Sequence, residues 1–83
     1  MIKCSTDLSR FMPIDREKAG RLTAVACKYE CTLTLERDNI ILNLKSMIGL
    51  LSQSIPKDGR MTLIAEGEDE EAAAAEIRGL IEG

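Results

Sequence analysis

The stretch that decides the fold is CTLTLERDNIILNL, residues 31–44 of the 83-residue chain. In residues 31–36 apolar and polar side chains alternate, which predicts a strand with one buried face. Residues 37–39, Arg-Asp-Asn, have the composition of a turn, and residues 40–44 are apolar enough for a returning strand. The sequence therefore predicts an antiparallel hairpin at the centre of the chain.

Before the hairpin the sequence predicts a strand, a loop and a helix. Residues 2–8 carry the apolar side chains of a first strand. Pro13 disfavours a helix in the residues before it, so residues 11–14 are expected to form a loop. In residues 15–29 the apolar side chains recur at helical spacing and share one face: Leu22, Val25, Ala26 and Tyr29.

After the hairpin the sequence predicts a short helix, a turn, a strand and a last helix. Ser46 opens the short helix, and residues 55–59 contain the Pro and Gly of a turn. Alternation in residues 61–65 predicts the strand. The acidic run 66–71 is expected to be a solvated helix start that holds no ligand, because carboxylates complement the positive end of a helix dipole. The apolar face of the last helix is formed by Ala73, Ile77, Leu80 and Ile81.

This order of elements, β-α-β-β-α-β-α, predicts an α+β fold. Strands with one apolar face and three amphipathic helices indicate a four-stranded antiparallel sheet with three helices on one face. The length and the absence of a low-complexity linker favour one domain over residues 1–83.

The composition excludes several classes of function. The chain has no histidine, which removes Ser-His-Asp and Cys-His nucleophile systems, phosphohistidine chemistry and the commonest zinc ligand. One Tyr, one Phe and no Trp make a stacking platform for single-stranded nucleic acid improbable, and the net charge of -3 also argues against direct nucleic-acid binding.

The three cysteines predict neither a metal site nor a redox site. Cys27 and Cys31 lack CxxC spacing, so they and Cys4 are expected to be small buried residues. No secretory signal opens the chain, and no apolar run approaches the roughly 20 residues of a membrane span. The expected location is the cytoplasm, and no cofactor is expected.

Two residues sit where helix N-caps belong. Asp15 and Ser46 each stand directly before a helical pattern, and their side-chain oxygens can accept hydrogen bonds from unpaired backbone N–H groups. A cap contributes about 1 kcal/mol to stability, and capping would account for both residues fully.

Two segments resemble HPr, the small histidine-containing phosphocarrier of the bacterial sugar phosphotransferase system. Residues 43–52, NLKSMIGLLS, resemble the regulatory serine segment of that family, and residues 65–71, AEGEDEE, resemble the entry into its last helix. The likeness runs from about residue 15 to the end. It implies the HPr open-faced sandwich, which has the order of elements predicted above.

The resemblance also implies that the carrier chemistry is lost. Family members begin the first helix with a histidine, a variable residue, an arginine, a proline and an alanine, where this chain has DREKA at residues 15–19. Asp15 stands in place of the phosphate-accepting histidine, and Glu17 in place of the phosphate-binding arginine. Besides a cap, Asp15 is interpreted as a fixed charge in place of phosphohistidine, or as an acceptor forming an acyl phosphate.

By the same resemblance, Ser46 would be the target of an HPr-type serine kinase/phosphorylase. The neighbouring apolar residues fill the core or form a docking surface for a transcriptional regulator or a sugar-pathway enzyme. This expected partner-binding set comprises Arg16, Glu17, Gly20, Ala24, Met47, Ile48 and Leu51. Leu50 is the member of the short helix assigned to the core.

The favoured hypothesis is therefore a non-enzymatic HPr-like protein that acts in regulation of carbon catabolism and is related to sugar transport, with Ser46 as its candidate phosphorylation site. One alternative is a phosphoryl carrier that uses Asp15. The other is a divergent paralogue on the same scaffold with an unrelated partner.

Overall fold

In the residues that the structure describes, seven elements follow one another in the predicted order. The structure is a computed structural model that describes residues 1–52 and 55–83. The strands are β1 (Ile2–Asp7), β2 (Thr32–Arg37), β3 (Ile40–Asn43) and β4 (Arg60–Glu66). The helices are α1 (Arg16–Cys27), α2 (Met47–Ser52) and α3 (Glu70–Glu82).

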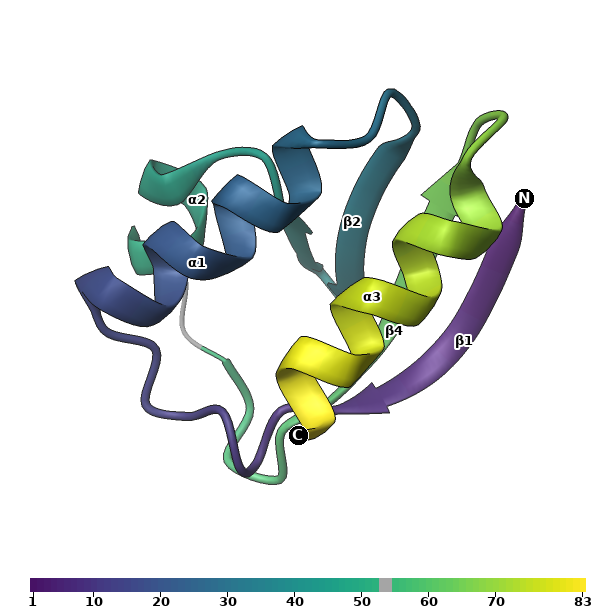
Figure 1. Cartoon of the computed structure of the whole chain (residues 1–83). Helices are drawn as coiled ribbons and strands as arrows, with labels where there is room; N and C mark the ends of the chain where they lie inside the picture. Colours follow the sequence, from purple (N-terminus) through teal and green to yellow (C-terminus); the bar gives the residue numbers. More distant parts are fainter. Residues whose placement is uncertain (53–54) are drawn as a thin grey trace.

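The four strands form one antiparallel sheet in the order β1-β4-β2-β3. β4 therefore lies between the first strand and the central hairpin, although it comes last of the four in sequence. All three helices lie on one face of the sheet, and none of the described helices covers the other face (Figure 1). This arrangement confirms the predicted α+β open-faced sandwich.

The core lies between the helices and the apolar face of the sheet. Leu33 and Leu35 of β2 are fully buried, and Leu63 of β4 pairs with Leu35 in the register of the two strands. Each buried leucine contributes roughly 1.5–3 kcal/mol relative to an exposed one. The helices cover these strands with small and branched apolar side chains: Ala19, Leu22 and Ala26 of α1, and Ala73, Ile77 and Ile81 of α3.

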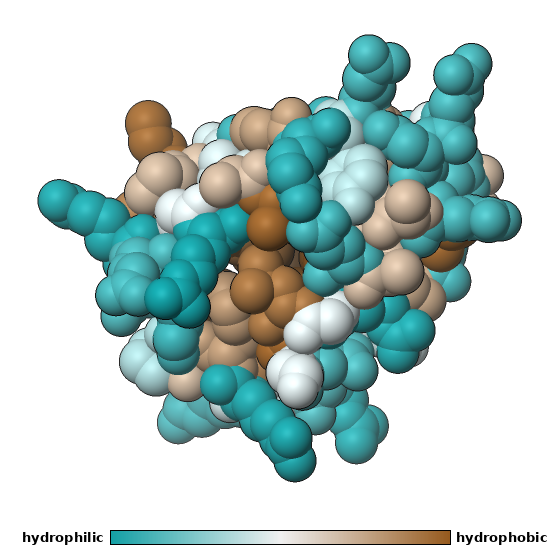
Figure 2. All heavy atoms as spheres, in the orientation of Figure 1, coloured by the Kyte–Doolittle hydropathy of each residue, from teal (hydrophilic) through white to brown (hydrophobic). Residues whose placement is uncertain are grey.

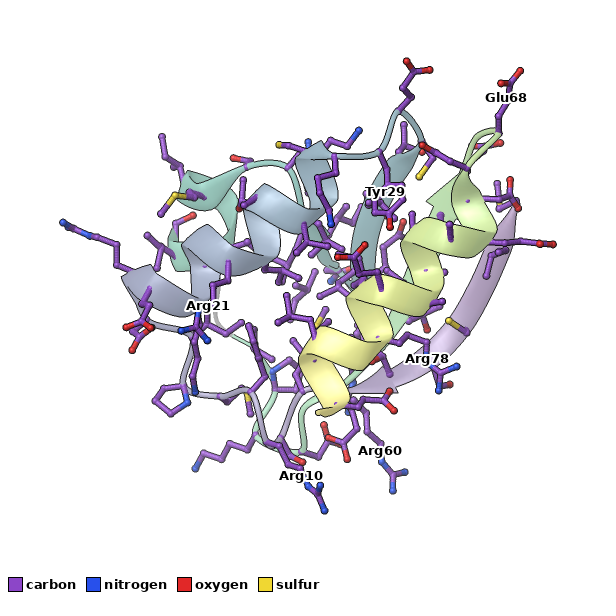
Figure 3. The ribbon with its side chains drawn as sticks, viewed as in Figure 1. Arg10, Arg21, Tyr29, Arg60, Glu68 and Arg78 are labelled. Carbon is purple, nitrogen blue, oxygen red and sulfur yellow. The ribbon has the colours of Figure 1, made fainter. Side chains whose placement is uncertain are left out.

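The end of α1 differs from the prediction. The helix ends at Cys27, and Tyr29 lies beyond it, half-buried against the core. The Tyr29 hydroxyl donates a hydrogen bond to Glu76 of α3, and the Lys28 ammonium lies 2.7 Å from the same carboxylate. Figure 3 shows Tyr29 between the end of α1 and α3. The hydrogen bonds from Lys28 and Tyr29 hold the pKa of Glu76 below its usual range.

The prediction of three buried cysteines is wrong for Cys27, which is exposed, and holds only in part for half-buried Cys4. Cys27 follows buried Ala26, and one residue turns a helix by about 100°, away from the core. Cys31 is buried as predicted. Burial, with a smaller contribution from Asp69, raises the pKa of the Cys31 thiol to about 11, so the thiol is protonated at neutral pH.

The acidic turn before α3 is not simply solvated, contrary to the prediction. The Asp69 carboxylate accepts hydrogen bonds from the backbone N–H groups of Glu30, at 2.9 Å, and Cys31, at 3.0 Å. The bond from Glu30 is the main cause of a lowered pKa for Asp69. Asp69 thus fastens the start of β2 to the start of α3.

Gly67 allows the turn between β4 and α3 to approach the start of β2 closely. Its φ of 151° is one that side chains rarely adopt, and a Cβ added there would lie 2.5 Å from the Cβ of Cys31. The sequence predicts a strand-to-helix turn at Gly67, and the close approach to Cys31 gives the physical reason for glycine. Across the described residues, no helix combines the length and the apolar composition needed to cross a bilayer.

Candidate docking surface

Asp15 caps α1, as its position predicts. Its backbone is extended, with φ -91° and ψ -177°, and its Oδ1 accepts a hydrogen bond of 2.9 Å from the Lys18 backbone N–H. The Asp15 carbonyl accepts from the Ala19 N–H at 2.9 Å, which closes the first helical turn. The carboxylate is exposed but already engaged by the backbone.

Lys18 supports the loop that leads into this cap. Its ammonium donates to the Phe11 carbonyl at 2.9 Å and lies 5.6 Å from the centroid of the Phe11 ring. Phe11 itself is buried in the core. The loop before Asp15 is therefore held by the Lys18 hydrogen bond and by the burial of the Phe11 side chain in the core. These two contacts fix the position of the start of α1.

Glu17 is paired within its own helix. Its carboxylate lies 2.8 Å from the Arg21 guanidinium one turn further on, and both side chains are largely exposed. An exposed pair of this kind adds little stability. Arg16, also exposed, lies beside this pair on the first turn. The first turn of α1 thus presents mixed charges to solvent and no histidine.

Ser46 caps α2, as predicted. Its Oγ accepts a hydrogen bond of 3.2 Å from the Gly49 N–H, and its carbonyl accepts from the Leu50 N–H at 3.1 Å. The adjacent Lys45 ammonium donates to the Tyr29 carbonyl at 2.7 Å, which ties the entry of α2 to the end of α1. Ser46 remains half-buried rather than enclosed.

The apolar residues of α2 divide between core and solvent. Leu50 is buried, which confirms its assignment to the core, whereas Ile48 is 81% exposed and Leu51 44% exposed. Met47 is half-buried and packs against the core. The remaining exposure is large for aliphatic side chains, and in Figure 2 hydrophobic atoms project where Figure 1 places α2.

α1 packs against α2, so the predicted partner-binding residues lie on two adjoining helices (Figure 1). Ala24 is exposed, and among residues 1–52 and 55–83 a Cβ added at Gly20 would meet no atom within 4 Å. Crowding within the fold therefore does not explain the glycine inside the helix. We call the following set the α1–α2 surface: Arg16, Glu17, Gly20, Ala24, Met47, Ile48 and Leu51.

The sequence alone does not reveal the role of the Asp69 carboxylate, which connects the start of α3 to the start of β2. In the sequence Asp69 looks like its acidic neighbours, although its carboxylate accepts hydrogen bonds from residues 38 and 39 positions earlier. The only signal in the sequence is Gly67 two residues before it. The contact supports the fold and lies outside the α1–α2 surface.

The fold is that of the HPr open-faced sandwich, and the comparison with known families agrees. The family profile described as "PTS HPr component phosphorylation site" matches residues 14–83. The chain belongs to the HPr family. Members of this family are phosphocarriers and not catalytic enzymes.

Individual relatives are HPr proteins and an HPr-like protein. The HPr-like protein Crh of Bacillus subtilis (strain 168) is 33% identical over 57 residues, which cover 69% of this chain and 67% of Crh. The crystal structure of HPr-C-His from Thermoanaerobacter tengcongensis matches with a TM-score of 0.87 and 28% identity, over 99% of this chain and 92% of that one. A crystal structure of Bacillus subtilis Crh, described as a swapped dimer, matches with a TM-score of 0.75 and 26% identity, over 99% and 87%.

Proposed function

We propose that this HPr-family protein is a regulatory binding module that transfers no phosphoryl group and is switched by phosphorylation of Ser46. The observation that carries the proposal is the state of Asp15. This residue stands where the family resemblance places the histidine, and its carboxylate caps α1 through the Lys18 N–H. The chain has no histidine elsewhere to take over the task.

The charges of the first turn support the same conclusion. Asp15 and Glu17 bring two carboxylates to the place where a carrier must accept a phosphoryl group. Like charges within a few ångströms repel, and Glu17 cannot supply the guanidinium that the family arginine provides. The alternative, an acyl phosphate on Asp15, would have to form on Oδ2, because Oδ1 accepts from the Lys18 N–H, and it would bring the phosphoryl group close to the Glu17 carboxylate.

The likeness to Crh supports a role in regulation. The Crh structure is described as that of a catabolite repression containing protein, so we assign this chain to carbon catabolite control. Its proposed partners are an HPr-type serine kinase/phosphorylase and a transcriptional regulator or sugar-pathway enzyme. The α1–α2 surface is the proposed contact, with Ile48 and Leu51 as its exposed apolar centre.

Ser46 is well placed to control this contact. It immediately precedes Met47 and Ile48, so a phosphate there would add negative charge beside the apolar centre. The change would alter which proteins bind the surface, while the aliphatic core beneath, beginning with Leu50, stays in place. The switch therefore acts on recognition and not on folding.

The test is phosphorylation with an HPr-type serine kinase and ATP, followed by mass spectrometry of the intact chain. We expect the mass of one phosphate on the wild-type protein and none on Ser46→Ala. Ser52→Ala, which removes an exposed serine at the other end of α2, is the matched control and should be phosphorylated like the wild type. An unchanged mass for the wild type, or equal phosphorylation of Ser46→Ala, would contradict the proposal.

A further inference from the structure

The outer edge of β1 carries backbone groups that the sheet does not pair. In the part of the chain that the structure describes, β1 is an edge strand and its only strand neighbour is β4. The Leu8 N–H bonds to the Gly59 carbonyl on the β4 side at 2.8 Å. Because backbone N–H groups alternate in direction along a strand, those of Lys3, Ser5 and Asp7 point outward.

The Asp7 N–H confirms this direction. It donates to Glu82 of α3 over a long distance of 3.4 Å, away from β4. The side chains of Lys3, Ser5 and Asp7 are all exposed and lie on the uncovered face of the sheet, since even-numbered Thr6 faces the helices and is buried. The three residues whose backbone groups point outward, Lys3, Ser5 and Asp7, therefore carry a positive, a neutral and a negative side chain in that order along the edge.

We propose that two copies of the chain pair through β1, antiparallel and with Ser5 opposite Ser5 on a two-fold axis. In this register Lys3 of each copy faces Asp7 of the other, so opposite charges meet twice. The two sheets join into one antiparallel sheet of eight strands, and the interface is the same patch on both copies. This proposal is independent of the proposed regulatory function.

The charges select this register among those that the outward groups allow. Centring the pair on Lys3 would oppose two lysines, and centring it on Asp7 would oppose two carboxylates, both of which destabilise a cross-strand pair. Shifting the register by one pair of residues leaves both charges without an opposite partner. A lysine on an edge strand ordinarily discourages pairing with another strand. In this register, however, the Asp7 carboxylate of the second copy faces Lys3 and balances its charge.

At the end of β1, the Glu82 side chain of α3 must release the Asp7 N–H before a second copy can pair there. The hollow that Ser5 and Asp7 line also reaches Arg60 and Thr62 of β4 and Glu36 and Arg37 of β2, so it crosses the sheet and does not follow the edge. Arg78 extends from α3 toward β1 (Figure 3), and its Nε lies 3.6 Å from the Glu82 carboxylate. The other outer strand is a weaker candidate, because β3 reads Ile-Ile-Leu-Asn and has no charge to specify a register.

The pairing differs from strand exchange. Each β1 keeps its own β4 as neighbour, so the dimer should form and dissociate rapidly with concentration. The test is sedimentation of the full chain over a range of concentrations at low salt, with circular dichroism to verify folding. We expect a reversible monomer–dimer equilibrium for the wild type.

Charge-reversal variants test the proposed register most directly. Lys3→Asp and Asp7→Lys each oppose like charges in the homodimer, and each is expected to raise the dimer dissociation constant about tenfold. An equal mixture of the two variants restores both opposite-charge pairs, so it should dimerise at least as well as the wild type. Ser5→Asp should weaken pairing, whereas Asn43→Asp, the same added charge on β3, should leave it unchanged.

Three results would overturn the proposal. The first is a wild-type chain that remains monomeric up to about 1 mM. The second is a dimer that does not dissociate on dilution and whose formation is unchanged by Lys3→Asp, which would indicate exchanged strands. The third is a mixture of Lys3→Asp and Asp7→Lys that dimerises no better than either alone. Asp7→Lys also removes a side-chain bond to the Ser9 N–H, so Ser5→Asp decides if that variant is misfolded.

Discussion

Replacing Ile48 by aspartate is expected to lower kcat/KM for phosphorylation of Ser46 by roughly 30-fold, the effect of losing one central apolar contact in an interface. Ile48 is 81% exposed, so the substitution removes no core packing and should leave the free energy of unfolding nearly unchanged. The measurement is the kinase rate as a function of substrate concentration.

The matched control is Ile41→Asp, which introduces the same charge at an isoleucine that is 62% exposed on β3. Ile41 lies outside the α1–α2 surface, so its variant should be phosphorylated like the wild type. Equal rates for Ile48→Asp and the wild type would remove α2 from the docking surface, whatever happens at Ser46.

Replacing Gly67 by alanine should destabilise the fold by about 3 kcal/mol, the combined effect of an unfavourable φ and overpacking. The added Cβ would lie 2.5 Å from the Cβ and 2.6 Å from the Cα of Cys31, and backbone atoms cannot easily move away. Urea unfolding followed by circular dichroism measures the change.

Gly20→Ala is the control for the same chemical change in open space. It should stabilise α1 by about 0.5–1 kcal/mol, because alanine favours the helix and the new methyl group meets no neighbour. Equal effects of the two substitutions would refute the packing argument. The kinase assay adds a second result: a partner that approaches α1 closely should phosphorylate Gly20→Ala less efficiently than the wild type.

The local features of the fold can be predicted because their causes are local. Alternation in residues 31–36 and 61–65 predicts β2 and β4, since a strand with one buried face needs apolar side chains at every second position. The caps at Asp15 and Ser46 are predictable for the same reason, because each bonds an N–H three residues further on. Leu50 is correctly assigned to the core of an otherwise exposed helix.

The features that the sequence does not reveal depend on distant residues. β4 lies between β1 and β2, an order that no spacing along the chain specifies. Asp69 is indistinguishable from its acidic neighbours until the fold brings Glu30 and Cys31 to it. Cys27 is a different case, because the predicted helical face of Leu22, Val25 and Ala26 already excludes it, and its exposure follows from its position about 100° from Ala26 around the helix.

The chain's proposed mode of action, contact without phosphoryl transfer, is tested most directly with labelled phosphoenolpyruvate and the enzyme of the phosphotransferase system that draws on it. We expect no label on the wild-type chain. The double variant Asp15→His with Glu17→Arg, which restores the family's histidine and arginine and keeps Lys18 in place of its proline, is the positive control and should be labelled. An acid-stable, hydroxylamine-sensitive label on the wild type, lost in Asp15→Asn, would show that Asp15 carries phosphate and would contradict the account.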